Sequence, residues 1–476
     1  MLLLSPALAA TITVDNSSDY VQACYDLDAG DTLLLDTSGG RFEGKCTVTV
    51  ADVTIAPVEG QETALVESMW LNTGATRATV RGLHFQSDDQ IQLFTTSATD
   101  GLAEDIVLSG GIGNGLVVNS YADLEVIGLT ASGFEGGAAV VVTSYTAGAA
   151  ALTLSGAEIT ESITAIGVYA ANEGTSSLDL SDSTLSGNLC QGGETLGLGG
   201  GIQANGAATV DVDNVTFEAN LADWGGAIGA FQGDERSTMT IHDSTFNSNH
   251  ADLGAAIYFD YGTLTITDSS FCGNSSSTGS AIVTTQANTT LSRVVFQTQH
   301  GNEGVVLLER GVHTHSHLSM VNNRTDVLSI GLGQGAALDL TNSLFVGNGG
   351  VFDELYTGGW NAFFDNEGAL DVLSGELTTG EAGFVEGYDP DNCEEKPYIR
   401  GDSMLVDAGK PGTTDPDGTV ADIGAYWAGA EDEGEDAVLE SSSEAWFAGG
   451  CAQSSVALVF LVGLVGRTRR RAEAHC

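Results

Sequence analysis

The sequence predicts an all-β chain folded as a right-handed, single-stranded parallel β-helix, and two recurring motifs carry this prediction. The first motif has apolar residues at positions 1 and 3, a turn residue at 5, an aromatic residue or Leu at 8, and Asn at 11. The second is a run of small residues ending in Ile. Motifs that recur at this length indicate a solenoid. Copies of the first motif begin at Leu178, Val210, Met239, Leu264 and Leu338, and the first four starts lie 32, 29 and 25 residues apart.

Each part of the first motif has a structural meaning. The apolar pair indicates a short strand with one buried face, and Asp or Asn at position 5 favours a turn. The aromatic side chain then points inward from a second strand. Stacked coils lie about 4.8 Å apart, so Phe is expected above Phe and Asn above Asn. An antiparallel sandwich also has many short strands, but it does not predict motifs recurring in fixed phase.

The second motif supplies the third wall of each coil. In Gly225-Gly226-Ala227-Ile228 the glycines allow a bend and the Ile fills the wall. Related runs end at Ile202, Ile257 and Ile282. From residue 60 to 385, at about 25 residues per coil, the sequence predicts about 13 coils. We expect irregular coils over residues 289–335, where Arg293 interrupts a strand.

The two ends of the solenoid are expected to differ from its body. Residues 1–10 resemble the end of a secretory signal, with Ala7-Leu8-Ala9 as the cleavage site; a buried first strand is the alternative. Residues 11–60 form an N-terminal cap and the first coils, with a short amphipathic segment at 20–27. Residues 61–385 form the β-helix and 386–428 a C-terminal cap, in which Ile423 and Tyr426 cover the last coil. Without caps, the end coils would be open sheet edges.

The last residues form a separate region. Residues 429–448 are an acidic linker that we expect to be disordered. Residues 449–476 hold Cys451, a short apolar run and four Arg in the last ten positions. The apolar run at 456–465 is shorter than the roughly 20 residues of a transmembrane helix.

Charge and cysteine content narrow the function. Acidic residues number 64 and basic residues 15, giving a net charge of −49. Such a surface repels nucleic acid and attracts divalent cations, although acidity also serves solubility. Cys24 and Cys46 flank the first strands and could form a disulfide, whereas Cys190, Cys272 and Cys393 have no evident partners. No C-x-x-C motif occurs, which argues against a zinc or redox site.

The recurring motifs resemble known families. The Gly-Gly-Ala-Ile and Phe-x-x-Asn pair resembles the repeats of polymorphic outer membrane proteins, and more broadly the pectin-lyase-like β-helix superfamily. The Cys451, apolar and Arg segment resembles C-terminal sorting signals of myxobacterial surface proteins, which implies processing near Cys451 and attachment at the cell surface or outer membrane. The Gly-His-Gly, Arg-x-Lys and Arg-x-Pro-x-x-Arg patterns of related enzymes do not occur.

Three histidines and three aspartates are candidate functional residues. His313, His315 and His317 alternate along a strand and are expected to share one outward face, as a transition-metal or binding surface or as a solvated ladder. The second set surrounds a Gly turn, where Ca²⁺ could bind oxygen ligands or the side chains could simply cap the turn. These residues are Asp415, Asp417 and Asp422.

Two functions follow as hypotheses. The first is a secreted, surface-anchored, non-catalytic adhesin or glycan-binding protein, because the solenoid signal is complete and no catalytic motif is recognisable. The second is a polysaccharide lyase or glycoside hydrolase, which the superfamily resemblance implies. Carbohydrate or another cell surface is the expected partner, and calcium the one expected cofactor.

Overall fold

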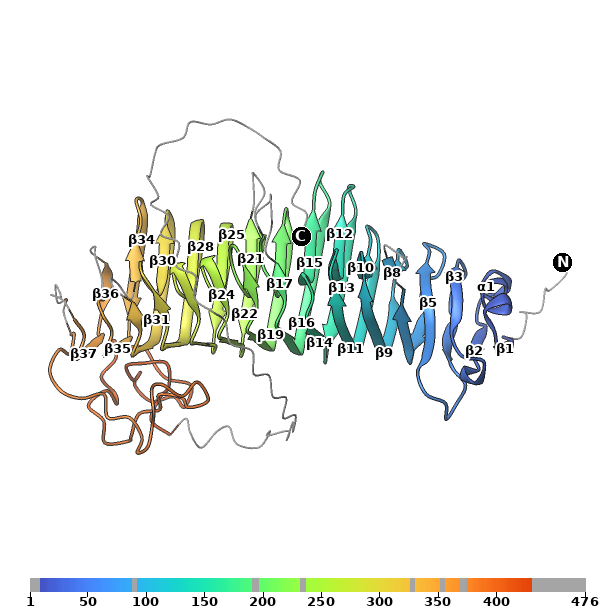
Figure 1. Cartoon of the computed structure of the whole chain (residues 1–476). Coiled ribbons are helices and arrows are strands. Elements are labelled where there is room, and N and C mark those ends of the chain that lie inside the picture. Colours follow the sequence, from blue (N-terminus) through green and yellow to red (C-terminus); the bar gives the residue numbers. More distant parts are fainter. Residues whose placement is uncertain are drawn as a thin grey trace, which may run out of the picture.

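The chain folds as a parallel β-helix whose coils stack along one axis (Figure 1). The computed structural model describes residues 9–87, 92–190, 197–231, 237–325, 330–351, 356–367, 373 and 375–429. The prediction of an all-β parallel solenoid of about 13 coils is confirmed. Three walls form one continuous 31-stranded sheet, and a short 6-stranded sheet lies at one corner.

The first wall holds the apolar pairs of the first motif. Several strands continue around the turn into the next wall, so β9, β11, β16, β19 and β31 each belong to two walls. The strands of the first wall are β1 (Thr11–Val14), β2 (Thr32–Leu35), β4 (Thr54–Pro57), β6 (Thr79–Arg81), β9 (Gly101–Gly111), β11 (Asp123–Phe134), β13 (Ala149–Ser155), β16 (Thr175–Ser186), β19 (Ala208–Glu218), β22 (Ser237–His242), β25 (Ile257–Thr267), β28 (Ile282–Gln297), β31 (Gly311–Val321), β34 (Ala336–Thr341) and β36 (Thr357–Gly359).

The second wall holds the aromatic position of the same motif. It also contains the last part of β28, the first parts of β3 (Phe42–Val48) and β5 (Ala64–Leu71), and β7 (Leu83–Gln86), β14 (Glu158–Thr160), β23 (Thr245–Asn247), β26 (Ser270–Cys272), β35 (Leu344–Val346) and β37 (Ala362–Phe364).

The third wall begins at the small-residue motif. It contains the last parts of β3 and β5, the first parts of β25 and β28, and β8 (Gln92–Thr96), β10 (Asn114–Val118), β12 (Ala138–Ser144), β15 (Thr164–Ala170), β18 (Ile202–Asn205), β21 (Ile228–Phe231), β30 (Val306–Glu309) and β33 (Ile330–Leu332). The corner sheet contains β17 (Leu189–Cys190), β20 (Leu221–Ala222), β24 (His250–Leu253), β27 (Ser275–Thr278), β29 (His300–Gly301) and β32 (Arg324–Thr325).

A helix covers the N-terminal end of the stack (Figure 1). This helix, α1 (Ser17–Asp26), has Asn16 as its N-cap, whose side chain accepts a hydrogen bond from the Asp19 backbone N–H. Tyr20, Ala23 and Cys24 are buried against the first coils. A short 3₁₀ helix, η1 (Thr37–Gly39), follows β2.

Stacked side chains fill the interior as the motif predicts. The Phe217, Phe246 and Phe271 rings lie 4.8 and 4.5 Å apart in nearly parallel planes. Asn220 and Asn249 are fully buried, and the Asn220 amide donates to Asn249 Oδ1 at 3.1 Å. The Asn249 amide also donates to the Phe217 carbonyl of the preceding coil. The Asn ladder therefore satisfies buried backbone groups at the turns.

A left-handed residue marks the corner between the first and second walls. Position 5 of the motif has φ between +45° and +54° at Asp182, Asn214, Asp243, Asp268, Arg293, His317 and Asn342. Asp and Asn tolerate this conformation better than most side chains. The expected break at Arg293 is wrong: β28 runs through it, and Arg293 occupies the corner while its guanidinium pairs with Asp268.

The C-terminal segment, residues 375–429, first adds one bridge to the end of the stack, where Leu377 pairs with Ala362 of β37. It folds back along the second wall, on the side of the last coils (Figure 1). Ile423 packs on outward-facing Leu344 and Ala362, and the Ala425 N–H donates to Ser319 Oγ at 2.9 Å. The expectation that Ile423 and Tyr426 cover the open end of the last coil is therefore wrong. Apolar residues on the outside of the second wall offer another surface on which the strap can bury its own apolar side chains.

Candidate functional site

The C-terminal segment builds a second small core outside the solenoid. Ile399, Leu405 and Ile423 of this segment are buried with Leu344 and Phe364 of the wall. Phe345 follows Leu344 in β35 and Phe363 precedes Phe364 in β37, and the two Phe rings stack inside the solenoid. Leu344 and Phe364 therefore point outward, away from the main core. We call residues 375–429 the strap.

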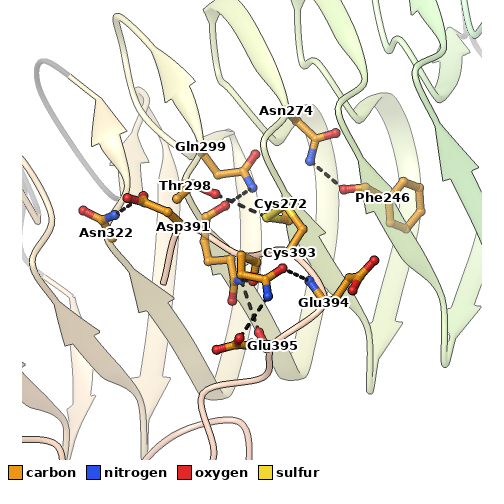
Figure 2. The surroundings of a disulfide bond; sticks show 12 residues. Phe246, Cys272, Asn274, Thr298, Gln299, Asn322, Asp391, Cys393, Glu394 and Glu395 are labelled. Carbon is orange, nitrogen blue, oxygen red and sulfur yellow. Dashed lines mark hydrogen bonds between the residues drawn. A yellow bond between two sulfur atoms is a disulfide. The ribbon is translucent and has the colours of Figure 1, made fainter. Parts of the chain in front are cut away.

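A disulfide and several hydrogen bonds hold the strap to the wall. Cys393 is bonded to Cys272 of β26, 121 residues earlier (Figure 2). Nearby, the Asn322 amide donates to Asp391 at 2.7 Å, and the Gln297 amide donates to the Asn392 carbonyl at 2.7 Å. Sequence analysis did not predict the Cys272–Cys393 disulfide, because these two cysteines come together only when the strap folds back along the wall.

A cavity of about 210 Å³ lies between strap and wall. Thr245, Asn247 and Gln297 line it from the wall, and Lys396 and Tyr426 from the strap. Burial raises the pKa of the Tyr426 phenol far above its usual value. The cavity is a partly open pocket in the strap's packing, with no group of three acidic or His side chains in its lining.

The aspartates predicted to bind calcium lie in the strap and accept backbone hydrogen bonds. Asp422 accepts from the Asp407 and Ala428 N–H groups, and one Asp415 oxygen accepts from the Asp422 N–H. Asp417 accepts from the backbone and hydroxyl of Thr419. Burial raises the pKa of Asp415 to about 6. The arrangement is that of carboxylates capping turns, and calcium binding stays a prediction.

The prediction that three histidines share an outward face is wrong. His313 and His315 are fully buried inside the solenoid, where His313 pairs with Leu338 of the next coil and His315 with Leu340. Leu318 and Met320 also point inward, because the chain turns a corner at His317, where φ is +52°. Alternation does not carry across a corner.

Aligning residues 313–323 with the first motif predicts the buried placement of His313 and His315. His313 and His315 occupy the apolar pair, His317 the left-handed corner, Met320 the aromatic position and Asn323 the Asn position. All four ring nitrogens of His313 and His315 lack hydrogen-bond partners, as does the Thr289 hydroxyl, which belongs to the residue paired with His313. Burial lowers the pKa of His313 to about 4 and that of His315 to about 3. These rings are core residues and not a binding surface.

A different histidine lies among carboxylates on the exposed corner of the first wall. Ligand atoms of Asp213, His242 and Asp243 all lie within 4.8 Å of one another, the one such group of three among the residues described. His242 Nε2 lies 3.1 Å from an Asp243 oxygen. Burial raises the pKa of Asp243, and Asp268 and Asp213 raise it further against the opposing effect of His242.

An aromatic surface lies on the outside of the third wall. Trp224 packs over Tyr258, with ring centroids 4.9 Å apart, and its ring centroid lies 6.2 Å from that of Phe231. Phe231 is 45% exposed, whereas Tyr258 is buried beneath Trp224. We call Trp224, Phe231 and Tyr258 the aromatic platform. Sequence reasoning missed it, because these residues lie outside the repeated motif positions.

Polar groups border the aromatic platform along the same wall. Asp260, Thr285 and Glu309 form one column on three successive coils, and the Thr285 hydroxyl donates to Asp260. Burial raises the pKa of Tyr258 to about 12. The hydrogen bond with Thr285 opposes this shift, and the charges of Asp260 and Glu309 add to it. Toward the N-terminal side, the Tyr169 hydroxyl donates to Gln203 Oε1 at 2.7 Å.

The remaining predicted residues lie at the ends of the chain. Cys24 and Cys46 form a disulfide that joins α1 to β3. Cys451, the acidic linker and the anchor segment fall outside the described residues, as does most of the signal remnant. Within the described part of the chain, no helix is long and apolar enough to cross a membrane.

Comparison with known proteins supports the same architecture. A family model described as a right handed beta helix region matches residues 114–296. No curated protein matches the chain.

Among solved structures, a PL6 alginate lyase in complex with a trisaccharide is 12% identical, with 75% of this chain and 89% of that chain covered and a TM-score of 0.36. A pectate lyase is 10% identical, with 89% and 97% covered and a TM-score of 0.30. A tailspike protein of E. coli bacteriophage HK620 in complex with a pentasaccharide is 12% identical, with 72% and 69% covered and a TM-score of 0.30.

Proposed function

We propose that this chain is an exported, surface-displayed β-helix that binds glycans without cleaving them, and that the aromatic platform is its binding surface. The single observation that carries the proposal is the partly exposed Trp224–Phe231 pair on the outer face of the third wall. Aromatic rings present flat apolar faces with little conformational freedom to lose on binding. A sugar ring offers a matching face of C–H groups, and its hydroxyls can reach the surrounding polar groups.

The neighbouring side chains suit hydroxyl-rich ligands. Glu309 is exposed on the same wall, beyond the platform along the coil axis, and its carboxylate can accept hydrogen bonds from sugar hydroxyls. The net charge of −49 disfavours polyanionic glycans. Neutral oligosaccharides are therefore the proposed ligands.

Two disulfides between described residues support export. Cys24–Cys46 and Cys272–Cys393 join residues distant in sequence, and such bonds persist mainly outside the reducing cytosol. Attachment through residues 449–476 is part of the proposal. Intact-mass measurement of native protein tests it: loss of the residues after about Cys451 supports processing, and retention of residues 467–476 contradicts it.

A glycoside hydrolase remains the second candidate, because one pair of carboxylates favours it. Asp260 and Glu309 are two coils apart in one column beside Tyr258, so their backbones lie about 9.6 Å apart. Inverting glycosidases hold two carboxyl groups about 6.5–9.5 Å apart. Sugar release that disappears in Asp260→Asn and in Glu309→Gln would establish this alternative.

Binding to a glycan array tests the main proposal. We expect the purified chain to bind neutral glycans, and Phe231→Ala to lose most of that signal. Tyr145→Ala is the matched control, because Tyr145 is an exposed aromatic residue (59%) at the end of β12, away from the platform. Binding that Phe231→Ala leaves intact, or the absence of binding to any glycan, contradicts the proposal.

A further inference from the structure

The exposed corner of the first wall carries a side-chain cluster that the proposed function does not use. Asp213 ends the first-wall part of β19, His242 ends β22 one coil later, and Asp243 occupies the left-handed corner that follows. Register pairs Asp213 with His242 directly. Coil stacking therefore brings a carboxylate and an imidazole from two coils onto one spot, with a second carboxylate beside them.

The two nitrogens of His242 face different groups. Nε2 faces the Asp243 carboxylate at 3.1 Å. Nδ1 lies 2.9 Å from the Thr267 hydroxyl and 3.4 Å from an Asp268 oxygen, both on the next coil. Metal-bound histidines characteristically give their second ring N–H to a hydroxyl, carbonyl or carboxylate, which fixes the tautomer and the ring orientation. The Thr267 hydroxyl and the Asp268 carboxylate provide such partners for Nδ1 of His242.

We propose that Asp213, His242 and Asp243 bind one divalent transition-metal ion of the zinc class, with Thr267 and Asp268 holding the imidazole in place. One imidazole nitrogen and two carboxylates form a ligand set that suits zinc rather than calcium, which prefers oxygen ligands alone. Two carboxylates with a neutral imidazole also balance the charge of the ion.

Neighbouring charges leave this site negative. Arg293 is committed to Asp268 by two hydrogen bonds from its guanidinium. Among the described residues, Lys396 of the strap is another cation near Asp243, and it affects the pKa of that carboxyl less than His242, Asp268 and Asp213 do. A bound cation would relieve the repulsion among the Asp213, Asp243 and Asp268 carboxylates, and it would link the successive coils of β19 and β22.

Calorimetric titration of the full chain with ZnCl₂ in 150 mM NaCl tests the proposal. We expect His242→Ala and Asp243→Asn each to weaken zinc binding at least tenfold relative to the unchanged chain. His250→Ala is the matched control, because His250 is also exposed and its ring also contacts a hydroxyl, that of Ser275, without belonging to a three-ligand group. It should bind zinc as the unchanged chain does.

Two further readouts separate a metal site from general attraction of cations. The absorption bands of added Co²⁺ should appear in the unchanged chain and vanish in His242→Ala, while circular dichroism shows both folded. Thr267→Val should weaken zinc binding about tenfold through the loss of support at Nδ1. Equal zinc affinity in the unchanged chain and His242→Ala, or equal loss in His250→Ala, overturns the proposal.

Discussion

At the scale of single residues, two buried histidines make the stability of this solenoid depend on pH. His313 and His315 take positions that hold Leu338 and Leu340 in the next coil. Their ring nitrogens have no partners, and burial lowers the pKa of both rings. The folded state therefore keeps them neutral, whereas the unfolded chain binds protons below about pH 6.5.

We predict that acid destabilises the chain through these rings. As pH falls from about 6.5 toward the lowered pKa values of about 4 and 3, the free energy of unfolding should fall by up to about 1.4 kcal/mol per pH unit for each ring. Urea unfolding at several pH values measures this slope. His315→Leu should flatten it and raise stability at pH 5, and an unchanged slope in that variant would contradict the assignment.

The Asn ladder is the second feature at this scale. Asn249 accepts hydrogen bonds from the backbone and side chain of Asn220, and donates to the Phe217 carbonyl. Asn249→Ala leaves these buried groups unpaired, so the free energy of unfolding should fall by about 2–4 kcal/mol. Asn247→Ala, two residues away and only partly buried, should cost about 1 kcal/mol or less. Equal losses in the two variants would contradict the role given to the ladder.

At the scale of elements, the strap packs on the side of the β-helix through a small core separate from that of the solenoid. Its core is small, and Cys272–Cys393 closes a loop of 121 residues. Constraining a loop of that size stabilises the folded state by about 5 kcal/mol in the chain-entropy treatment. We expect much of this stabilisation to hold the strap against the second wall.

Removal of this disulfide should release the strap before the coils unfold. In Cys393→Ser we expect trypsin to cut at Lys396 or Arg400 under conditions in which the β-helix stays intact. Cleavage sites follow from the fragment masses, and far-ultraviolet circular dichroism follows the coils. A strap that stays protected in Cys393→Ser would show that packing alone holds it.

At the scale of the whole molecule, the negative charge opposes compaction and should make stability depend on cations. We predict that chelation lowers the melting temperature and that millimolar calcium restores it more than sodium at equal ionic strength, through Asp415, Asp417 and Asp422. Asp417→Ala should remove most of the calcium-specific part. If sodium restores the melting temperature equally well, the effect is screening and the strap holds no calcium site.

The architecture was predictable from sequence because stacking repeats one set of local rules. Phe217, Phe246 and Phe271 recur in phase because each must lie on the one below. The path of the strap was not predictable, since Ile423 could pack on the last coil or on the outside of Leu344 with the same local pattern. The aromatic platform escaped prediction for a related reason: Trp224 and Phe231 meet only through the third wall and the loop before it.

The most direct test of the proposed function is a titration of one oligosaccharide into matched proteins, with product analysis of the same samples. The oligosaccharide is the neutral glycan that binds best on the array. We predict saturable binding by the unchanged chain and by Tyr145→Ala, at least tenfold weaker binding by Trp224→Ala and Phe231→Ala, and no shorter sugars after prolonged incubation. Equal affinity in all four proteins, or the appearance of cleavage products, would contradict a non-catalytic glycan-binding surface centred on the aromatic platform.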